Sequence, residues 1–192
     1  MSTPRPYLRH AAAGAAIALF AGGLTVISAP QAVGPAPLEP VTAVALSASN
    51  GEAQFERDVL SLINKARASK RKCGNRTYAK AKALKWNDQL AVAAEAHSVD
   101  MATLDYFSHT SRSGTSAGTR VKATGYRYKA MGETLAAGQT TPKAVVDAWL
   151  KSAPHCKILM SKSYTQLGVG YHSGSGYYGH YTSAEFAKPK KK

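Results

Sequence analysis

The sequence is poor in negative charge and in cysteine. Its 192 residues include 11 Asp and Glu against 25 Lys and Arg, and only two cysteines. Two cysteines allow a single intrachain disulfide. The sequence has no zincin motif, and it has no internal repeat. The chain is long enough for one domain with a substantial hydrophobic core.

Long hydrophobic runs are also scarce, and the one present lies near the N-terminus. Arg5, Arg9 and His10 precede an apolar run from Ala11 to Ile27, which is the order of charge and hydrophobicity in a secretory signal. A single membrane anchor is the competing interpretation, because the run approaches the length needed to span a bilayer. We expect a signal peptide within residues 1–30, with an uncertain cleavage site. Residues 31–50 contain prolines and no aromatics, which is typical of a flexible linker or propeptide.

The rest of the chain is strongly basic. Without residues 1–50 the chain loses Arg5, Arg9 and Glu39 and keeps a formal charge of +13. An exported domain with this charge will be attracted to anionic surfaces such as lipid head groups, acidic wall polymers or nucleic acid. The C-terminal tail, residues 188–192, is basic but has no interleaved aromatic residues, so no specific nucleic-acid partner is expected.

Two long amphipathic helices are predicted in the first half of the domain. Apolar residues follow helical spacing from Phe55 to Ala66. A second helix is expected after Asn87, a good N-cap. It has an apolar stripe formed by Leu90, Ala94, His97, Met101 and Leu104. We expect His97 to be a hydrogen-bonded core histidine rather than a ligand, because it lies on this stripe.

The second half alternates between helices and extended segments. Ser116 can cap a short helix that stops at Gly125, and residues 131–138 have the pattern of a buried strand. Thr140 or Thr141, followed by Pro142, indicates the start of another helix. Two strands, residues 167–171 and 177–186, end the domain as a hairpin. This order predicts an α+β fold with an antiparallel sheet flanked by helices.

The segment from Trp149 to Leu159 combines a helix end, a Ser-Ala-Pro break, and His155 beside Cys156. In an exported chain the two cysteines favour a disulfide between Cys73 and Cys156. The alternative is a reactive or metal-bound Cys156. Adjacent residues point in different directions on a helix or turn, which weakens a direct Cys–His pair.

Three polar residues are candidates for a functional site: His109, Glu133 and His155. Each lies near the end of a predicted element and beside apolar residues. Two imidazoles and a carboxylate can hold zinc or a similar divalent ion with one open position. Their separations of 24 and 22 residues do not form a local metal motif, so from spacing alone ordinary polar surface or core roles remain the alternative.

Five motifs in order resemble the CAP superfamily of cysteine-rich secretory, antigen 5 and pathogenesis-related 1 proteins, also called the SCP domain. The resemblance covers about residues 55–187 and is greatest to short exported bacterial members. The matching segments are Tyr106-Phe107-Ser108-His109, Gly125-Tyr126, Gly132-Glu133-Thr134, Trp149 to Leu159, and Leu167-Gly168-Val169-Gly170.

The resemblance implies a three-layer α-β-α sandwich, with the CAP domain at residues 51–187 and a central cavity. In the family this cavity often binds zinc or another divalent metal through two histidines, which correspond to His109 and His155, and Glu133 matches the family acid. Thr134 replaces the usual Asn, and His180 stands where an aromatic is common, so His180 is expected to alter the cavity rim. The second family acid is missing, because no Asp or Glu occurs from Thr110 to Met131.

We therefore expect a secreted, non-enzymatic binding or interaction module with a metal-capable cavity, whose ligand is a lipid, a cell surface or a cell-wall component. The alternative is a metal-dependent extracellular hydrolase of the peptidase or nuclease type, with Glu133 as the base acting on metal-bound water. An incomplete acid pair weakens this alternative. Binding to nucleic acid through charge alone is the third hypothesis. The oligomeric state does not follow from the sequence.

Overall fold

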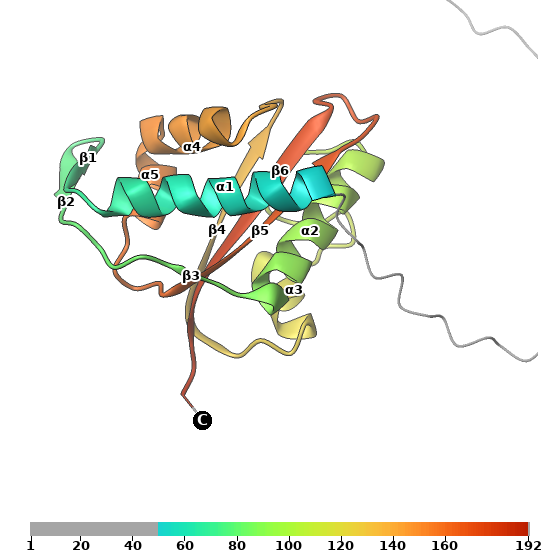
Figure 1. Ribbon diagram of the computed structural model, residues 1–192. Helices are drawn as coiled ribbons and strands as arrows, with labels where there is room; N and C mark the ends of the chain where they lie inside the picture. Colours follow the sequence, from blue (N-terminus) through green and yellow to red (C-terminus); the bar gives the residue numbers. More distant parts are fainter. Residues whose placement is uncertain (1–49, 192) are drawn as a thin grey trace, which may run out of the picture. The chain divides into compact units, whose positions relative to one another are not determined.

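The computed structural model describes residues 50–191, which form an α+β fold with a central sheet between layers of helices (Figure 1). The predicted signal peptide and nearly all of the linker lie outside the described residues. No helix within the described range is long and apolar enough to cross a membrane. The helices are α1 (Asn50–Arg67), α2 (Asp88–Thr103), α3 (Ala117–Ala123), α4 (Pro142–Lys151) and α5 (Ala153–Leu159).

The main sheet has the strand order β3-β5-β6-β4. Its strands are β3 (Lys85–Trp86), β4 (Tyr128–Ala137), β5 (Gln166–Ser173) and β6 (His180–Pro189). β4, β5 and β6 pair antiparallel as expected, whereas the two-residue β3 pairs parallel with β5. A separate hairpin is formed by β1 (Arg71–Cys73) and β2 (Arg76–Tyr78).

Sequence signals for the helix starts are confirmed. The side chains of Asn87, Ser116 and Thr141 each accept a hydrogen bond from a backbone N–H in the first turn of α2, α3 and α4. These bonds satisfy donors that would otherwise have no intrahelical partner. Ser152 ends α4 and precedes α5, where Pro154 lies in the first turn. The predicted break between Trp149 and His155 is therefore a corner between two helices.

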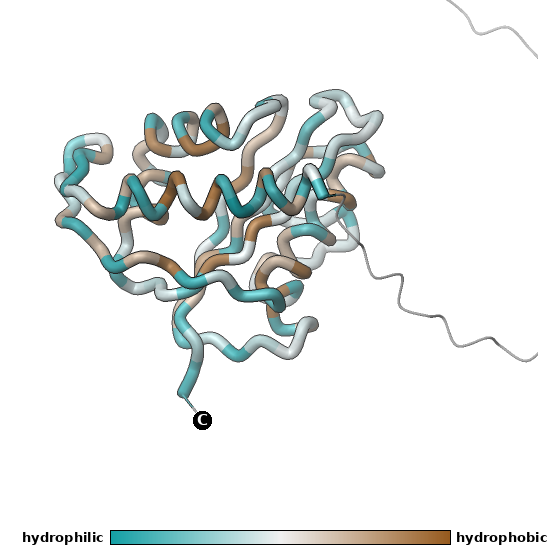
Figure 2. The backbone as a smooth tube through the Cα atoms, viewed as in Figure 1, coloured by the Kyte–Doolittle hydropathy of each residue, from teal (hydrophilic) through white to brown (hydrophobic). Residues whose placement is uncertain are grey.

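One face of the sheet packs against α1, α4 and α5 and forms the main hydrophobic core. Trp149 is 1 % exposed and donates its indole N–H to the Leu135 carbonyl at 2.8 Å. The Phe55 ring of α1 stacks on Tyr171 of β5, with ring centroids 3.7 Å apart. Hydrophobic positions alternate with hydrophilic ones along α1 and α4, as expected for helices with one buried side (Figure 2).

The opposite face of the sheet packs against α2 at very short range. A Cβ atom on Gly170 would lie 2.1 Å from the Glu95 backbone nitrogen, and one on Gly168 would lie 2.0 Å from that of Ala91. Glycine at alternate positions of β5 therefore allows the backbone of α2 to approach the sheet directly.

The disulfide between Cys73 and Cys156 is confirmed. It links β1 to α5, with 5.5 Å between the two Cα atoms. Both cysteines are buried beside Met160. Cys156 is therefore neither a free thiol nor a metal ligand, and the reactive-cysteine alternative is wrong.

Three details differ from the sequence expectation. Leu104, expected at the end of the apolar stripe of α2, is 46 % exposed because the helix ends at Thr103 and the chain turns away. The last strand begins at His180 rather than Tyr177. It also continues through Lys188 and Pro189, which pair with Ala130 and Tyr128, so the predicted start of the basic tail at residue 188 falls inside β6.

Candidate functional site

Glu133 lies on β4, an edge strand of the main sheet, and faces the α2 side. Its side chain is only 4 % exposed. Side chains alternate between the two faces of a strand, so Glu133 and Leu135 share this face while Thr134 and Ala136 face the other. The β4 register thus places one carboxylate beside the loop between α2 and α3 that carries His109.

His109 and Arg120 occupy the two carboxylate oxygens of Glu133. The Nδ1 atom of His109 lies 2.5 Å from Oε1, and the Nη2 atom of Arg120 pairs with Oε2. Arg120, on α3, also donates to the carbonyls of His109 and Thr115. The guanidinium therefore ties the His109 loop to Glu133.

These contacts shift the ionisation of both partners. Burial disfavours the charged form of Glu133, but the hydrogen bonds from His109 and Glu185 and the charge of Arg120 outweigh it, and the pKa of Glu133 lies below its usual value. The same hydrogen bond raises the pKa of His109, against the smaller effect of burial. Glu133 is thus a carboxylate, and it favours an imidazole that presents Nδ1–H to it and leaves Nε2 for other interactions.

His155 lies on α5 in the wall of a cavity of about 310 Å³. Trp149, Leu135, Phe107 and Tyr178 supply its apolar and aromatic surfaces. Burial, followed by the nearby charge of His109, lowers the pKa of His155, which favours its neutral form. The neutral form of imidazole is the one that binds metals.

Sequence reasoning missed Glu185, a second acid beside Glu133. The two residues are direct cross-strand partners in the β4–β6 register, so their side chains share one face. Glu185 is fully buried. Burial, with the neighbouring charge of Glu133, raises the pKa of Glu185 well above its usual value, which favours its protonated form. The alternation of inward and outward side chains along β6 could have indicated which face of the sheet Glu185 occupies. Only the β4–β6 register shows that Glu185 lies beside Glu133.

His97 and His180 have structural partners. His97 is fully buried, and its Nε2 atom lies 2.8 Å from the Ser108 carbonyl, which confirms the expected core histidine. His180 bonds the Tyr171 hydroxyl at 2.7 Å and does not line the cavity that contains His155. The effect of His180 on the cavity rim therefore stays a prediction.

The chemistry of this donor set fits a divalent ion only in part. Nε2 of His109 and the neutral ring of His155 are suitable nitrogen donors for zinc. Both oxygens of Glu133 are already engaged, so its geometry suits orienting His109. Within residues 50–191 no group of three or more His, Cys, Asp or Glu side chains is arranged to hold a metal.

Residues 60–186 match the family described as CAP, the cysteine-rich secretory protein family. This chain belongs to the CAP family. The match spans the elements that carry His109, Glu133 and His155, which were predicted from the motifs they share with this family.

Two curated relatives come from Bacillus subtilis. The uncharacterized protein YkwD is 37 % identical over 130 residues, which is 67 % of this chain and 47 % of that protein. The uncharacterized membrane protein YlbC is 37 % identical over 87 residues, which is 45 % of this chain and 25 % of that protein. The chain therefore spans less than half the length of either relative.

Solved structures agree on the fold. An extracellular protein of Bacillus anthracis that contains an SCP domain superposes with a TM-score of 0.59 and 30 % identity, over 71 % of this chain and 41 % of that one. An outer surface protein of Borrelia burgdorferi has the same TM-score at 19 % identity, over 74 % of this chain and 96 % of that one, and shows the fold alone. The predicted three-layer α-β-α architecture of the CAP family is confirmed.

Proposed function

We propose that this CAP domain is a secreted, non-enzymatic binding module, whose site combines a metal-capable histidine pair with an aromatic cavity. The observation that carries the proposal is that both oxygens of Glu133 are held, one by His109 and the other by Arg120. A carboxylate paired in this way is a weak general base, because the pairing lowers its pKa. The second acid, Glu185, is buried, and burial raises its pKa well above the usual value.

Aromatic side chains at the cavity mouth support a binding role. Phe107 and Tyr178 are about half exposed, and their ring centroids lie 5.8 Å apart. Tyr177, 85 % exposed, packs edge-on against Tyr178 at 5.1 Å. Exposed aromatics beside a concave apolar site are typical of ligand contacts. The ligand class that fits is a lipid, a surface component or a wall component with an apolar face.

A divalent ion such as zinc would be held by His109 Nε2 and by His155, and it would supply a positively charged Lewis acid for a ligand's oxygen atoms. Glu133 is a positioning residue in this proposal: it fixes the tautomer and the ring orientation of His109. Arg120 keeps Glu133 ionised and in place.

Zinc titration of the full chain by calorimetry tests the metal proposal. We expect binding to the wild type, no binding to the double variant His109→Ala/His155→Ala, and unchanged binding to the control His180→Ala. Glu133→Gln should weaken binding by about 10–100-fold and lower the His109 pKa in an NMR titration. Equal zinc affinity in the wild type and the double variant would overturn the site.

The alternative function is a metal-dependent extracellular hydrolase of the peptidase or nuclease type. His109 and His155 would hold the ion in the same way, and Glu133 would act as the base. Hydrolysis of peptide or phosphodiester substrates by the wild type that disappears in Glu133→Gln, while His180→Ala stays active, would favour this alternative over the binding module.

A further inference from the structure

A second cavity, of about 450 Å³, lies apart from the histidine site and shares no lining residue with the His155 cavity. The end of α1, the segment between β2 and β3, and the segment between α5 and β5 form its walls. Its charged and polar lining consists of Arg67, Lys80, Lys82, Lys162, Tyr164 and Thr165. Neither the family motifs nor the proposed metal site uses this cavity.

Arg67 is the central observation. It is 1 % exposed, and its guanidinium donates to three backbone carbonyls: Lys82 at 2.9 Å, Leu159 at 2.5 Å and Ser161 at 2.9 Å. No carboxylate among residues 50–191 forms an ion pair with it. Burial lowers its pKa, which shows that the protein holds this charge at a free-energy cost. Buried charges in proteins are normally paired, so the wall of the cavity contains a positive charge without a counterion.

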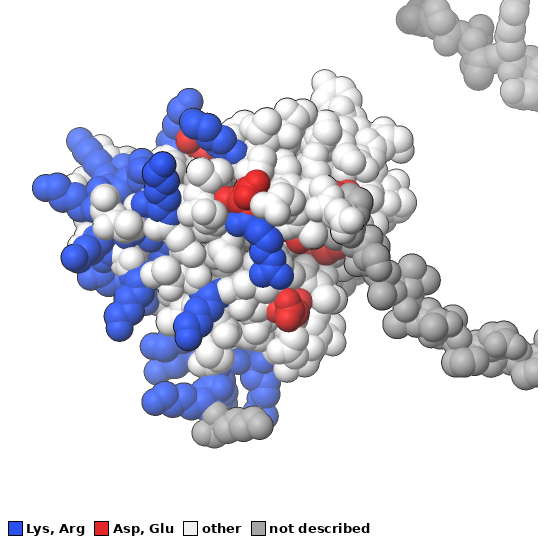
Figure 3. All heavy atoms as spheres, in the orientation of Figure 1, with Lys and Arg blue, Asp and Glu red and all other residues white. Residues whose placement is uncertain are grey.

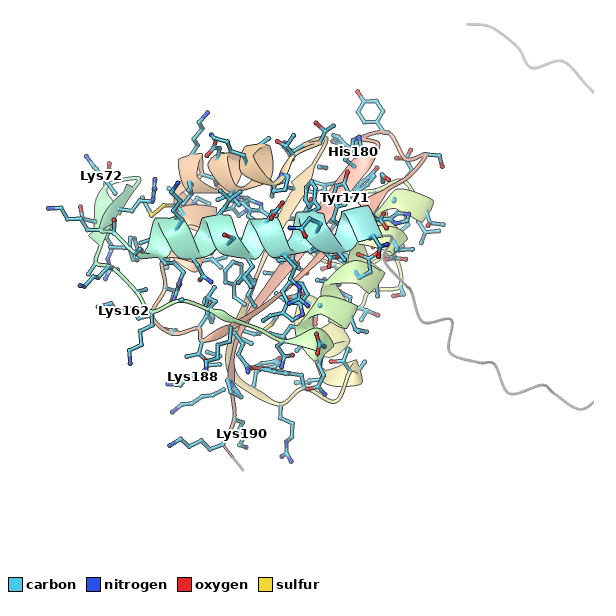
Figure 4. All side chains as sticks on the ribbon, in the orientation of Figure 1. Lys72, Lys162, Tyr171, His180, Lys188 and Lys190 are labelled. Carbon is cyan, nitrogen blue, oxygen red and sulfur yellow. A yellow bond between two sulfur atoms is a disulfide. The ribbon has the colours of Figure 1, made fainter. Side chains whose placement is uncertain are left out.

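Three lysines line the same cavity as Arg67. Lys80, Lys82 and Lys162 are exposed and line the same cavity. Lysines and arginines dominate this side of the molecule, over the β1–β2 hairpin, the segment that follows it and the C-terminal end of β6, and few acids accompany them (Figure 3). Lys72, Lys162, Lys188 and Lys190 are spread along this same side (Figure 4). The cavity is therefore one concave point on a larger cationic face.

We propose that this cavity binds a phosphate group of a phosphodiester polymer built from polyol or sugar units, with neighbouring phosphates lying along the cationic face. A planar guanidinium and mobile ammonium groups are the side chains that bind phosphate best. The cavity exceeds the size of a single phosphate, and Ala81, Ala83 and the Tyr164 ring provide apolar walls for the unit attached to it. The proposal does not depend on the metal site.

The aromatic residues of this face favour such a polymer over single-stranded nucleic acid. Base stacking requires uncovered aromatic faces. The Arg57 guanidinium lies 3.8 Å from the Trp86 ring centroid, and Arg76 lies 5.3 Å from that of Tyr78. The Tyr164 hydroxyl is bonded to the Met131 carbonyl, and its ring packs against Phe186. Guanidinium groups therefore cover the Trp86 and Tyr78 rings, and the Tyr164 ring, which packs against Phe186, lines the cavity. The described part of this face offers charge and a cavity but no uncovered aromatic ring for a base.

The test compares two variants of the full chain that lose the same charge. Lys80→Gln/Lys162→Gln removes two lysines of the cavity, and Lys151→Gln/Lys157→Gln removes two exposed lysines of α4 and α5 outside it. Binding is measured by calorimetry with poly(glycerol phosphate) of defined length. We expect the cavity variant to lose at least about tenfold in affinity and the control to lose less than about threefold. Zinc affinity should be equal in both variants, which separates this site from the metal proposal.

Three outcomes would overturn the proposal. Equal losses of affinity in the two variants would show that binding depends on net charge and not on the cavity. If single-stranded DNA with the same number of phosphates binds more tightly than poly(glycerol phosphate), the ligand is a nucleic acid. If phosphatidylglycerol vesicles bind more tightly than poly(glycerol phosphate), the ligand is a membrane surface. Arg67→Met serves as a second variant, provided that its melting temperature equals that of the wild type. It should then lose at least as much affinity for the polymer as the lysine variant. Retained affinity would contradict the role of Arg67.

Discussion

Two buried carboxyl groups show how individual residues respond to the packing of α1 and α2 on the sheet. Glu56 of α1 is 6 % exposed and accepts the Tyr171 N–H at 3.2 Å, and Glu95 of α2 is 8 % exposed. Burial raises the pKa of Glu56 to about 7, and burial together with the charge of Glu56 raises the pKa of Glu95 to about 8. His172 of β5 lies 3.9 Å from Glu95 and 3.7 Å from Glu52.

These shifts predict that the protein loses stability as the pH rises toward 8. In the unfolded state both carboxyl groups release their protons near pH 4.5, whereas in the folded state they keep them until the pH reaches about 7 and about 8. The free energy of unfolding therefore decreases across that range. We expect a loss on the order of a few kcal/mol between pH 5 and pH 8.5 in urea denaturation.

A neutral amide at position 95 tests the cause of this loss. Glu95→Gln should retain more of its stability at pH 8.5 than the wild type, because the amide cannot ionise. Asp58→Asn, at an exposed acid on the same helix as Glu56, should follow the wild-type curve. A pH dependence that is unchanged in Glu95→Gln would contradict the assignment.

At the scale of elements, the contact between β5 and α2 places the histidine site. Ser98 of α2 donates to the Gly170 carbonyl at 2.9 Å and lies 3.1 Å from the Ser183 hydroxyl of β6. The helix thus lies directly on two strands, and the loop that follows it brings His109 to Glu133 on β4. Any change that separates α2 from the sheet should displace this loop.

Gly170→Ala is expected to destabilise the protein by about 1–3 kcal/mol or more, since overpacked contacts force backbone shifts. The added methyl would overlap the Glu95 backbone, whereas Gly174→Ala would meet the Ala102 Cβ at 3.1 Å. The control variant Gly174→Ala should therefore lose much less stability. Thermal unfolding measures both variants, and the His109 NMR signals should shift in Gly170→Ala. Equal stabilities of the two variants would show that α2 can move away from β5 at little cost.

At the scale of the whole molecule, one disulfide connects distant parts of the chain. Cys73 and Cys156 are 83 positions apart. The bond joins the cationic β1–β2 hairpin to α5, the helix that carries His155. Reduction of this bond would therefore affect both proposed sites through the positions of these elements.

Removal of the disulfide should cost about 2–5 kcal/mol of stability, mainly because the reduced unfolded chain gains conformational freedom. Cys73→Ala/Cys156→Ala, measured by urea denaturation, should resemble the wild type in reductant. The same reductant should leave the variant's own transition unchanged, which serves as the control. A wild-type transition insensitive to reductant would contradict this contribution.

His109, Glu133 and His155 were predicted as site residues from motifs in order, and the structure brings His109 into contact with Glu133. That the three residues form one functional site stays a prediction. Arg120 and Glu185 were not predicted as parts of it. Each is separated from Glu133 in sequence, and their proximity depends on a helix crossing and on strand register. Local patterns carry no information about either.

The sequence by itself determined the α+β class, the caps of α2 and α3 and the family, because capping residues, periodicity and motif order are local properties. It favoured the disulfide because the chain has only two cysteines. Only the tertiary structure decided which charges lie together. It pairs Glu133 with Arg120 as well as His109 and buries Glu185 beside it. It also buries Arg67 in the wall of a cavity that three lysines line, with no carboxylate among the cavity's lining residues. The electrostatic environment of a side chain is set by neighbours distant in sequence, and those neighbours are fixed when the layers pack.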